Sequence, residues 1–475
     1  MPRTSVYIET YGCQMNKLDS ENVAAILSDA GFAVVEDMND AEVILLNTCG
    51  VRENAEVRVH GRIGELSSLR KKRPGLVFGV IGCMAQRLGW RLVSDVVRVV
   101  AGPDSYWRLP EMIHSVKEPR CAERMPGTPL IEHAGNPAPS ARREPRNARA
   151  AVDLRLDPSE TYEGVTPVHE SPFSAWVAVI RGCDNFCSYC IVPHTRGRER
   201  SVPAARVIGE IERLKSAGFR EITLLGQNVD SYRDGAVDFA ELLDRAADTG
   251  MPWIRFLTSH PRDLGEGVLD VMARRANVCP HLHLPLQSGS DRILHAMNRR
   301  YTAGRYLALV EAARGLVPGV SLTTDLIFGF PGETEEDFEA TIALMELVRF
   351  DFAYLYRYSE REGTPACTLP EQVPERLRIE RLKRAIELQN SITAERNREQ
   401  IGSIHTVLVK GPSRDGAGWY GFTETSVPVV IAGRSGSLGY PDACFAHAGD
   451  PVGPGEFARV LVESTTGASL VGRVV

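Results

Sequence analysis

The sequence predicts an α/β protein of several domains, with an open parallel α/β domain at the N-terminus, a central partial (β/α)6 barrel and a small β-barrel at the C-terminus. Short apolar strands alternate with amphipathic helices over the first two regions, at a longer period in the second. Short strands separated by glycine turns then follow to the C-terminus. The alternation is typical of parallel sheets covered by helices, and the short strands are typical of a barrel.

Length and composition limit the kind of protein. The 475 residues suffice for about three domains with buried cores. No apolar run approaches the roughly 20 residues that a membrane span requires, and the N-terminus lacks the apolar segment of a signal peptide. We therefore expect a cytoplasmic protein, and in such a reducing compartment cysteines, of which this chain has ten, more often bind metal than form disulfides. The net charge of -6 argues against indiscriminate nucleic-acid binding, although it leaves room for a local basic face.

The first domain is expected over residues 1–118. Its strands are predicted near residues 6–8, 43–46 and 76–81, and its helices near 18–30 and 53–69. Cys13, Cys49 and Cys83, the N-terminal triad, each follow one strand, and each has a neighbouring glycine that lets backbone approach a ligand. Open α/β sheets hold ligands at this edge. A single cysteine is more often a small buried hydrophobe, but the shared position favours a site for a metal cluster with three thiolates.

Residues 119–168 have the composition of a linker, rich in proline, alanine and arginine. Four arginines lie close together in this segment: Arg142, Arg143, Arg146 and Arg149. They could contact RNA phosphates, but the simpler interpretation is a solvated linker surface.

The second domain is expected over residues 169–398 as six βα units. Its strands are predicted near residues 176–180, 221–225, 254–257, 281–286, 322–328 and 352–358. After the fifth strand, Thr334 and Asp337 resemble a capping box, and an apolar helical stripe follows at Phe338, Ile342, Met345 and Val348. Six units predict an incomplete barrel, in which the chemistry takes place at the C-terminal ends of the strands.

Cys183, Cys187 and Cys190, the core triad, come directly after the first of these strands. Four thiolates would complete the coordination of a zinc ion or an iron–sulfur cluster, whereas three leave one metal position free for a small molecule. A zinc knuckle is the alternative, but no fourth ligand stands nearby at zinc spacing. Phe186 and Tyr189 fit a cluster shielded from water. The spacing resembles the radical S-adenosylmethionine (radical SAM) superfamily, in which a [4Fe-4S] cluster binds S-adenosylmethionine and cleaves it to a 5′-deoxyadenosyl radical.

The third domain is expected over residues 399–475 as a small β-barrel. A charged helix is predicted before it, near residues 375–400, and strands near 407–409, 427–431, 458–462 and 470–475. The region contains few lysines and arginines, which leaves RNA binding by this domain open.

Motifs along nearly the whole chain resemble the methylthiotransferase family, most closely its tRNA-modifying branch. In the first domain these are Tyr-Gly-Cys-Gln-Met-Asn, Asn-Thr-Cys-Gly-Val-Arg-Glu-Asn and Gly-Cys-Met-Ala-Gln. In the second they include Thr-Arg-Gly-Arg-Glu, Gly-Gln-Asn-Val-Asp-Ser-Tyr, His-Leu-Pro-Leu-Gln-Ser-Gly-Ser and Gly-Phe-Pro-Gly-Glu-Thr. The third domain is placed like the family's TRAM domain. Asp184, Val202 and Glu362 depart from the family pattern, but none of them replaces a cluster cysteine.

The resemblance implies methylthiolation at C2 of an N6-isopentenylated adenosine next to the tRNA anticodon. It implies S-adenosylmethionine and two [4Fe-4S] clusters as cofactors, the radical-generating cluster on the core triad and a sulfur-carrying auxiliary cluster on the N-terminal triad. An aromatic C2–H is too inert for acid–base attack, so a carbon radical fits this reaction. The implied partners are the isopentenylated tRNA, a reduced flavodoxin-type electron donor and a sulfur donor, for a monomer without a membrane partner.

Two glycine-containing turns at strand ends are expected to contact S-adenosylmethionine. They contain Gly226, Gln227 and Asn228 after the second strand, and Gly329, Gly332 and Glu333 after the fifth. Glycines there let backbone groups approach the methionine and adenine portions, although such turns are often only structural. On the same rim, Ser259, His260, Gln287 and Ser288 are candidates for ribose or substrate contacts.

Arg196, Arg198 and Arg200 follow the core triad, and they predict either a phosphate or carboxylate site or a solvated basic face. Phosphate contacts position RNA without reading its sequence, so specificity is expected from an unstacked adenine held against aromatic or apolar walls.

Four cysteines match none of these motifs and are interpreted as structural: Cys121, Cys279, Cys367 and Cys444. Two other functions remain as alternatives. One is a methylthiotransferase acting on an aspartate of a ribosomal protein or on another modified adenosine, and the other is a non-catalytic iron–sulfur protein that binds RNA.

Overall fold

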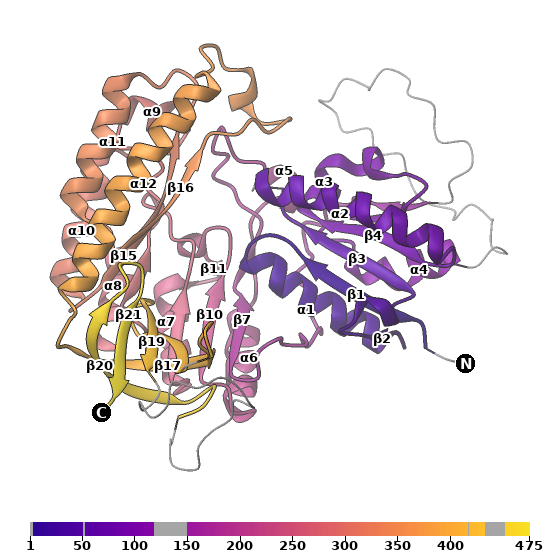
Figure 1. Ribbon diagram of the computed structural model, residues 1–475, viewed down its shortest axis with the longest axis horizontal. Coiled ribbons are helices and arrows are strands. Elements are labelled where there is room, and N and C mark those ends of the chain that lie inside the picture. Colours follow the sequence, from indigo (N-terminus) through magenta and orange to yellow (C-terminus); the bar gives the residue numbers. More distant parts are fainter. Residues whose placement is uncertain (1–2, 51–52, 118–149, 417, 433–451) are drawn as a thin grey trace. The chain divides into compact units, whose positions relative to one another are not determined.

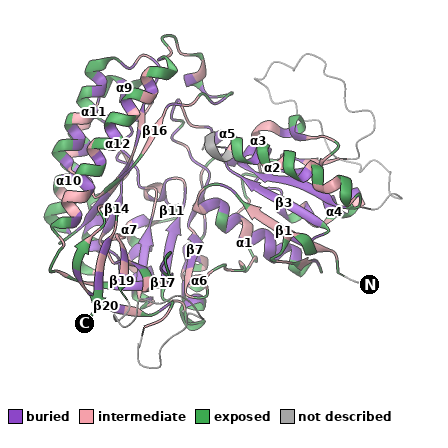
Figure 2. Ribbon diagram, viewed as in Figure 1, coloured by how far each residue is buried: buried purple, intermediate pink, exposed green. Residues whose placement is uncertain are grey.

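The computed structural model describes residues 3–50, 53–117, 150–416, 418–432 and 452–475. These residues form two compact units, one of residues 1–170 with 191–198 and one of residues 171–190 with 199–475 (Figure 1). No helix within the described ranges is both long and apolar enough to cross a membrane. Figure 2 shows that the strands are mostly buried, whereas the outward faces of the helices are exposed.

The first unit is an open parallel α/β sheet, as predicted. Its strand order is β2-β1-β3-β4-β5-β6, and every neighbouring pair is parallel. The strands are β1 (Ser5–Thr10), β2 (Ala33–Val34), β3 (Val43–Thr48), β4 (Val77–Gly82), β5 (Val97–Ala101) and β6 (Ala151–Asp153). Alternate residues of β3 enter two separate cores, because Val43 and Leu45 pack on one face and Ile44 and Leu46 on the other. Both faces of the sheet are therefore covered.

Within the described residues of this unit, four α-helices cover the sheet. They are α1 (Gln14–Asp29), α2 (Glu53–Lys72), α3 (Cys83–Leu88) and α4 (Leu109–Lys117). Residues of α1 and α4 pack in the core on one face, and residues of α2 and α3 pack in the core on the other. The carboxyl ends of β1, β3 and β4 lie at one edge of the sheet, because these strands are parallel neighbours.

The prediction of a linker over residues 119–168 is wrong for residues 150–168, the part of this range that the structure describes. Ala151–Asp153 form the edge strand β6, and Tyr162 packs in the core of the first unit. The carboxylate of Asp153 accepts hydrogen bonds from Ser105 and Arg108. Residues 118–149, with the four predicted linker arginines and Cys121, lie outside the described residues. A strand of three residues carries too little periodicity to be recognised from sequence.

The second unit contains the six predicted strands in sequence order. They are β7 (Ser174–Ala178), β10 (Glu221–Leu225), β13 (Trp253–Phe256), β14 (His281–His283), β15 (Ser321–Phe328) and β16 (Phe352–Arg357). They form two parallel three-stranded sheets, and an isolated bridge joins Ile254 of β13 to Val278, which precedes β14. Within the described part of the chain, β7 and β16 are edge strands, so the barrel is incomplete, as predicted.

Helices cover the outer side of these strands. They are α6 (Ala204–Ser216), α7 (Phe239–Asp248), α8 (Glu266–Arg274), α9 (Asp291–Ala296), α10 (Ala303–Leu316), α11 (Glu335–Val348) and α12 (Glu375–Arg398). The predicted capping box of α11 is confirmed, since Thr334 and Asp337 each bond the other's backbone N–H. Phe338, Met345 and Val348 of its stripe are buried in the core of the unit.

The C-terminal strands close into a five-stranded barrel in the order β17-β18-β19-β21-β20. They are β17 (Ile404–Pro412), β18 (Gly418–Thr423), β19 (Pro428–Ala432), β20 (Phe457–Thr465) and β21 (Leu470–Val474). The small β-barrel is therefore confirmed, although β18 was not foreseen. Cys444 lies outside the described residues.

Buried polar contacts attach this small barrel to β10 and β13 of the core. Lys410 Nζ donates to Glu221 at 2.7 Å, and Arg255 donates to the carbonyl oxygens of Thr423 and Glu424 at 2.8 and 2.9 Å. Cys279 is buried beside this contact in a small apolar cluster with Trp253 and Leu408, as expected for a structural cysteine. The C-terminal barrel and the core thus form one unit.

Candidate functional sites: two cysteine triads

The N-terminal triad lies at one edge of the first sheet. Cys13 precedes α1 after β1, Cys49 follows β3, and Cys83 begins α3 after β4. Two glycines allow the three to approach: a Cβ placed on Gly12 would lie 2.6 Å from the Cβ of Cys49, and one on Gly50 would lie 3.3 Å from that of Cys83. The structure therefore brings together the three cysteines that the sequence placed on three separate loops.

Buried amides fix the loops that carry this triad. Asn16 Nδ2 donates to Asn47 Oδ1 at 3.1 Å, and Asn47 Nδ2 donates back to the carbonyl oxygen of Asn16 at 2.8 Å. The Cys13 thiol donates to Asn16 Oδ1 at 3.3 Å. Asn16 and Asn47 are fully buried, so these hydrogen bonds are shielded from water and hold the start of α1 against the end of β3.

Arg196 contributes a buried positive charge to the N-terminal triad. It lies in α5 (Val192–Arg196), and residues 191–198 belong to the first unit although they directly follow the core triad in sequence. Its guanidinium donates to Asp19 at 2.6 Å and hydrogen-bonds Cys83, and Arg196 and Asp19 are only 3% and 0% exposed. A solvated basic face is therefore wrong for Arg196, because its side chain is buried, whereas a phosphate or carboxylate contact stays a prediction. Of the other two arginines, Arg198 is exposed and Arg200 is buried.

The environment of this triad favours thiolate at one position. A hydrogen bond with Cys49 lowers the pKa of the Cys13 thiol to about 6, and the charge of Arg196 acts in the same direction. Burial raises the pKa of Cys83, against the lowering effect of Arg196. Thiolate is the form that binds metal. Three converging cysteines beside a cationic group fit a cluster with three thiolate ligands.

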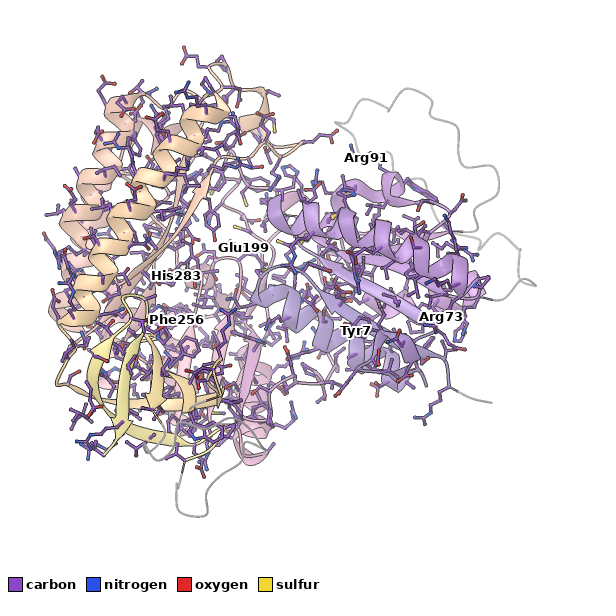
Figure 3. All side chains as sticks on the ribbon, viewed as in Figure 1. Tyr7, Arg73, Arg91, Glu199, Phe256 and His283 are labelled. Atoms are coloured by element: carbon purple, nitrogen blue, oxygen red, sulfur yellow. The ribbon has the colours of Figure 1, made fainter. Side chains whose placement is uncertain are left out.

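The core triad lies on a loop held from several sides. Within it, Ser188 Oγ donates to the carbonyl oxygen of Ala296 at 2.7 Å, and Asn298 Nδ2 donates to that of Phe186 at 2.9 Å. At the base of the loop, Asp184 and Glu199 each accept the other's backbone N–H, at 3.2 and 3.1 Å (Glu199 is labelled in Figure 3). Phe186 has a positive φ of 47° and is exposed, contrary to the expected shielding, whereas Tyr189 packs in an apolar cluster.

Arg299 is a buried cation beside the core triad. Its guanidinium donates to Cys187 Sγ at 3.4 Å, to the hydroxyl of Tyr301 at 2.9 Å and to the carbonyl oxygen of Pro285 at 3.0 Å. The arginine is only 5% exposed. Burial raises the pKa of Cys183 to about 12, so metal must displace its proton.

No set of three His, Cys, Asp or Glu side chains in the described ranges has the spacing that would hold a single metal ion. A [4Fe-4S] cluster is larger than one ion and takes its ligands at its corners, so its cysteines stand further apart. Both triads fit such a cluster in number, chemistry and burial.

The rim next to the core triad carries buried polar groups. Asn228 Nδ2 donates to Asp263 at 2.7 Å, and Asp230 accepts the backbone N–H of His260 at 2.8 Å. Burial raises the pKa of Asp230 to about 7 and lowers that of His260 to about 2, so His260 is neutral. In the described part of the chain, the side-chain oxygens of Gln227, Asn228 and Gln287 are buried without a hydrogen-bond partner. Such acceptors suit the ammonium and hydroxyl groups of a cofactor.

The predicted rim residues differ in their availability. Gly226 closely approaches Ile180, and Gly329 closely approaches Arg378, so neither position has room for a side chain. The carboxylate of Glu333 accepts the backbone N–H of Gly329 at 2.9 Å and pairs with Arg381 at 2.8 Å. Glu333 therefore shapes the turn that contains Gly332. Ser259 and Ser288 are also buried, at 3% and 1% exposure.

Sequence analysis missed the charged residues around both triads. Asp230 stands in a quoted motif but received no role, and Asp19, Arg299 and Asp263 received none either. Their positions depend on contacts between residues distant in sequence, such as the 177 residues that separate Asp19 from Arg196. The available signal in the sequence was that Arg196 follows the cysteines of the core triad. This position indicates neither which residue pairs with Arg196 nor that Arg196 is buried.

Comparisons with known proteins agree with this architecture. The model of the "Radical SAM superfamily" matches residues 177–345, and that of "Uncharacterized protein family UPF0004" matches residues 5–102. Among solved structures, the radical S-adenosylmethionine methyltransferase TsrM from Kitasatospora setae is similar with a TM-score of 0.52 over 77% of each chain. At 15% identity this likeness shows the fold alone.

Curated relatives extend the similarity over the whole chain. The tRNA-2-methylthio-N(6)-dimethylallyladenosine synthase of Chlorobium luteolum is 43% identical, with 98% of this chain and 96% of the relative covered. Proteins with the same name from Chloroherpeton thalassium and Porphyromonas gingivalis are each 40% identical, with 100% and 99% of this chain covered and 96% and 95% of those relatives. The chain therefore belongs to the radical SAM methylthiotransferase family, in the branch of the tRNA-2-methylthio-N(6)-dimethylallyladenosine synthases.

Proposed function

We propose that this chain is a radical SAM enzyme that methylthiolates C2 of N6-dimethylallyladenosine next to the tRNA anticodon. The observation that carries the proposal is the similarity to synthases of this name over essentially the full length of both chains. The two cysteine triads support it, because each lies at the ligand-binding edge of its own α/β unit.

The two triads have different roles in this reaction. When bound, the cluster on the core triad supplies the electron that cleaves S-adenosylmethionine, and the cluster on the N-terminal triad supplies the sulfur. Arg299 balances negative charge at the core triad through its contact with Cys187. The Arg196–Asp19 pair does so at the N-terminal triad through Cys83.

S-adenosylmethionine binds on the rim of the core strands. Gly226 and Gly329 let these turns pack closely against Ile180 and Arg378, and Gln227 and Asn228 offer amide oxygens to the polar groups of the cofactor. Glu333 acts through its hydrogen bond to Gly329 and its ion pair with Arg381, which hold the turn in place.

The partners follow from this chemistry. The RNA substrate is a tRNA that already carries the isopentenylated adenosine. The reduction step requires a low-potential donor of the reduced flavodoxin type, and repeated turnover requires a sulfur donor. We propose that the chain acts as a monomer.

Mass spectrometry of nucleosides tests this function. The reconstituted protein is incubated without oxygen with isopentenylated tRNA, S-adenosylmethionine, sulfide and dithionite. The methylthio nucleoside is expected, together with 5′-deoxyadenosine. Formation of 5′-deoxyadenosine without the methylthio nucleoside would reject the tRNA substrate and retain the radical chemistry.

A further inference from the structure

The inner face of the second half of the core barrel carries an accessible group of aromatic and polar side chains. Alternate residues of β15 and β16 turn away from the helices, and the register pairs Thr323 with Phe352 and Asp325 with Tyr354. Their neighbours Leu322, Leu326 and Ala353 are buried on the helix side. His283 of β14 (labelled in Figure 3) lies on the same face, since it is paired in register with Thr323 and its ring contacts Tyr354 edge to face at 5.8 Å between centroids.

Two aromatic rings on this face are exposed. Phe352 is 46% and Tyr354 is 44% exposed, and their rings meet edge to face at 5.0 Å. Among the described residues of the six core strands, these are the large hydrophobic side chains that remain exposed. Leaving two adjacent rings open to water inside a barrel forgoes burial energy, which is typical of a surface that a ligand covers.

An acceptor lies directly beside the rings. Asp325 is paired in register with Tyr354, and its carboxylate lies 3.6 Å from Nε2 of His283. The other ring nitrogen of His283 is 3.0 Å from the hydroxyl of Thr323. The Asp325 side chain is 27% exposed, so one of its oxygens can accept a hydrogen bond from a ligand.

This face is continuous with the core triad. Ile327 stands two residues beyond Asp325 on β15 and packs in the same apolar cluster as Tyr189, which lies between Cys187 and Cys190. A strand rises about 3.3 Å per residue, so the Asp325 and Tyr354 row lies roughly 7 Å deeper than the row next to the cluster loop. A planar base that enters from the loop spans this depth.

We infer that this inner face binds the N6-alkylated adenine of the substrate RNA, with Phe352 and Tyr354 against the dimethylallyl chain and Asp325 accepting the N6–H. The inference rests on the proposed function. An N6-dimethylallyl adenine has one remaining N6–H donor and an apolar chain on the same nitrogen. An exposed aromatic pair next to a carboxylate matches both groups. C2 then points toward the cluster loop, because it lies across N1 from the N6 substituent.

Binding of two matched RNAs tests the inference. The reconstituted protein is titrated against fluorescent anticodon stem-loops that carry either dimethylallyladenosine or adenosine, and the ratio of the two Kd values is measured. Tyr354→Ala and Phe352→Ala are each expected to lower the preference for the dimethylallyl RNA about tenfold, the contribution of one or two buried methylene groups. Asp325→Asn is expected to weaken both RNAs equally, since both offer an N6–H.

Tyr420→Ala is the matched control, because Tyr420 is similarly exposed, at 40%, but lies on β18 of the C-terminal barrel. It should leave the ratio unchanged. If the ratio of Kd values is unchanged in both aromatic variants while the wild type still methylthiolates its RNA, this inference is wrong and the proposed function stands. Weaker binding of S-adenosylmethionine in these variants would assign the face to the cofactor and overturn it as well. Failure of the wild type to methylthiolate either RNA would instead reject the proposed function.

Discussion

The two cysteine triads differ in how the protein balances charge around them. At the N-terminal triad, the guanidinium of Arg196 is paired with the buried carboxylate of Asp19. At the core triad, Arg299 donates to neutral groups, the Tyr301 hydroxyl and the Pro285 carbonyl oxygen, and to the Cys187 sulfur. Reduction adds negative charge to a cluster, so an uncompensated cation favours electron entry. The difference suits a core site that accepts electrons and an N-terminal site that carries sulfur.

The largest expected difference between the triads comes from removing a ligand. Cys187→Ala should abolish cleavage of S-adenosylmethionine, because the radical-generating cluster loses one of three thiolates. Cys49→Ala should retain part of the cleavage and stop sulfur insertion. The two products, 5′-deoxyadenosine and the methylthio nucleoside, are quantified in the same reaction, with iron content measured for each variant. Equal loss of cleavage in both variants would contradict the division of roles.

Variants of Arg196 and of Asp19 should shift the reduction potential of the auxiliary cluster in opposite directions. Arg196→Gln leaves the carboxylate uncompensated and should lower the reduction potential of the auxiliary cluster by on the order of 100 mV, from Coulomb's law at an effective dielectric constant near 20. Asp19→Asn leaves the guanidinium and should raise it. The double variant should return toward wild type. Potentials are measured by redox titration with electron paramagnetic resonance.

Arg198→Gln is the control for that test, since Arg198 lies two residues from Arg196 but is exposed. Water and salt screen exposed charges, so its effect on the potential should be several times smaller. Asp19→Asn is also expected to lower the free energy of unfolding by about 3–5 kcal/mol, because it leaves a buried cation unpaired. Equal shifts for Arg196→Gln and Arg198→Gln would mean that the buried pair does not act on the cluster.

Arg299→Gln tests the other half of the comparison. Removing this cation should lower the reduction potential of the core cluster by on the order of 50 mV and slow cleavage of S-adenosylmethionine at a fixed dithionite concentration. Arg299→Lys should restore most of the potential, because it restores the charge. Arg300→Gln is the neighbouring control, since Arg300 is exposed. A potential that is unchanged in Arg299→Gln, with full iron content, would remove the proposed electronic difference between the triads.

The elements on which both sites rest could be predicted from sequence. The six core strands, the capping box of α11 and the strand-end positions of Cys13, Cys49 and Cys83 follow local patterns of apolar and turn residues. These patterns repeat within a few residues, so one sequence is enough to read them.

What surrounds the sites could not be predicted in this way. The Arg196–Asp19 pair and the contact between Arg299 and Cys187 join residues that are 177 and 112 positions apart, and nothing in the local sequence of either arginine indicates its partner. The exposure of Phe352 and Tyr354 is a second case. The sequence of β16 is typical of a buried strand. Only the assembled barrel shows which face of this strand lacks a covering helix.

The two sites also differ in how they hold a buried carboxylate, Asp19 at the N-terminal triad and Asp230 on the core rim. The effect expected from removing Asp230 is the smallest of those predicted. Asp19 is ion-paired, whereas Asp230 accepts hydrogen bonds from Ser259 and the backbone of His260, and burial raises its pKa to about 7 from 3.8. Between about pH 4 and 7 the folded protein therefore holds a proton here that the unfolded chain has released. The stability that this group contributes is complete below pH 4 and is lost as the pH rises through 7.

Asp230→Asn removes that titration, so the stability of the variant relative to wild type should increase between pH 5 and pH 8 by roughly 1–3 kcal/mol, bounded by 1.36 kcal/mol for each unit of pKa shift. Urea unfolding at both pH values measures it. Asp244→Asn is the control: Asp244 pairs with Arg275, which lowers its pKa below the usual 3.8, so the difference between this variant and wild type should not change between pH 5 and pH 8. A pH-independent difference for Asp230→Asn would show that Asp230 is already ionised at pH 5, and that the core rim, like the N-terminal triad, compensates its buried carboxylate.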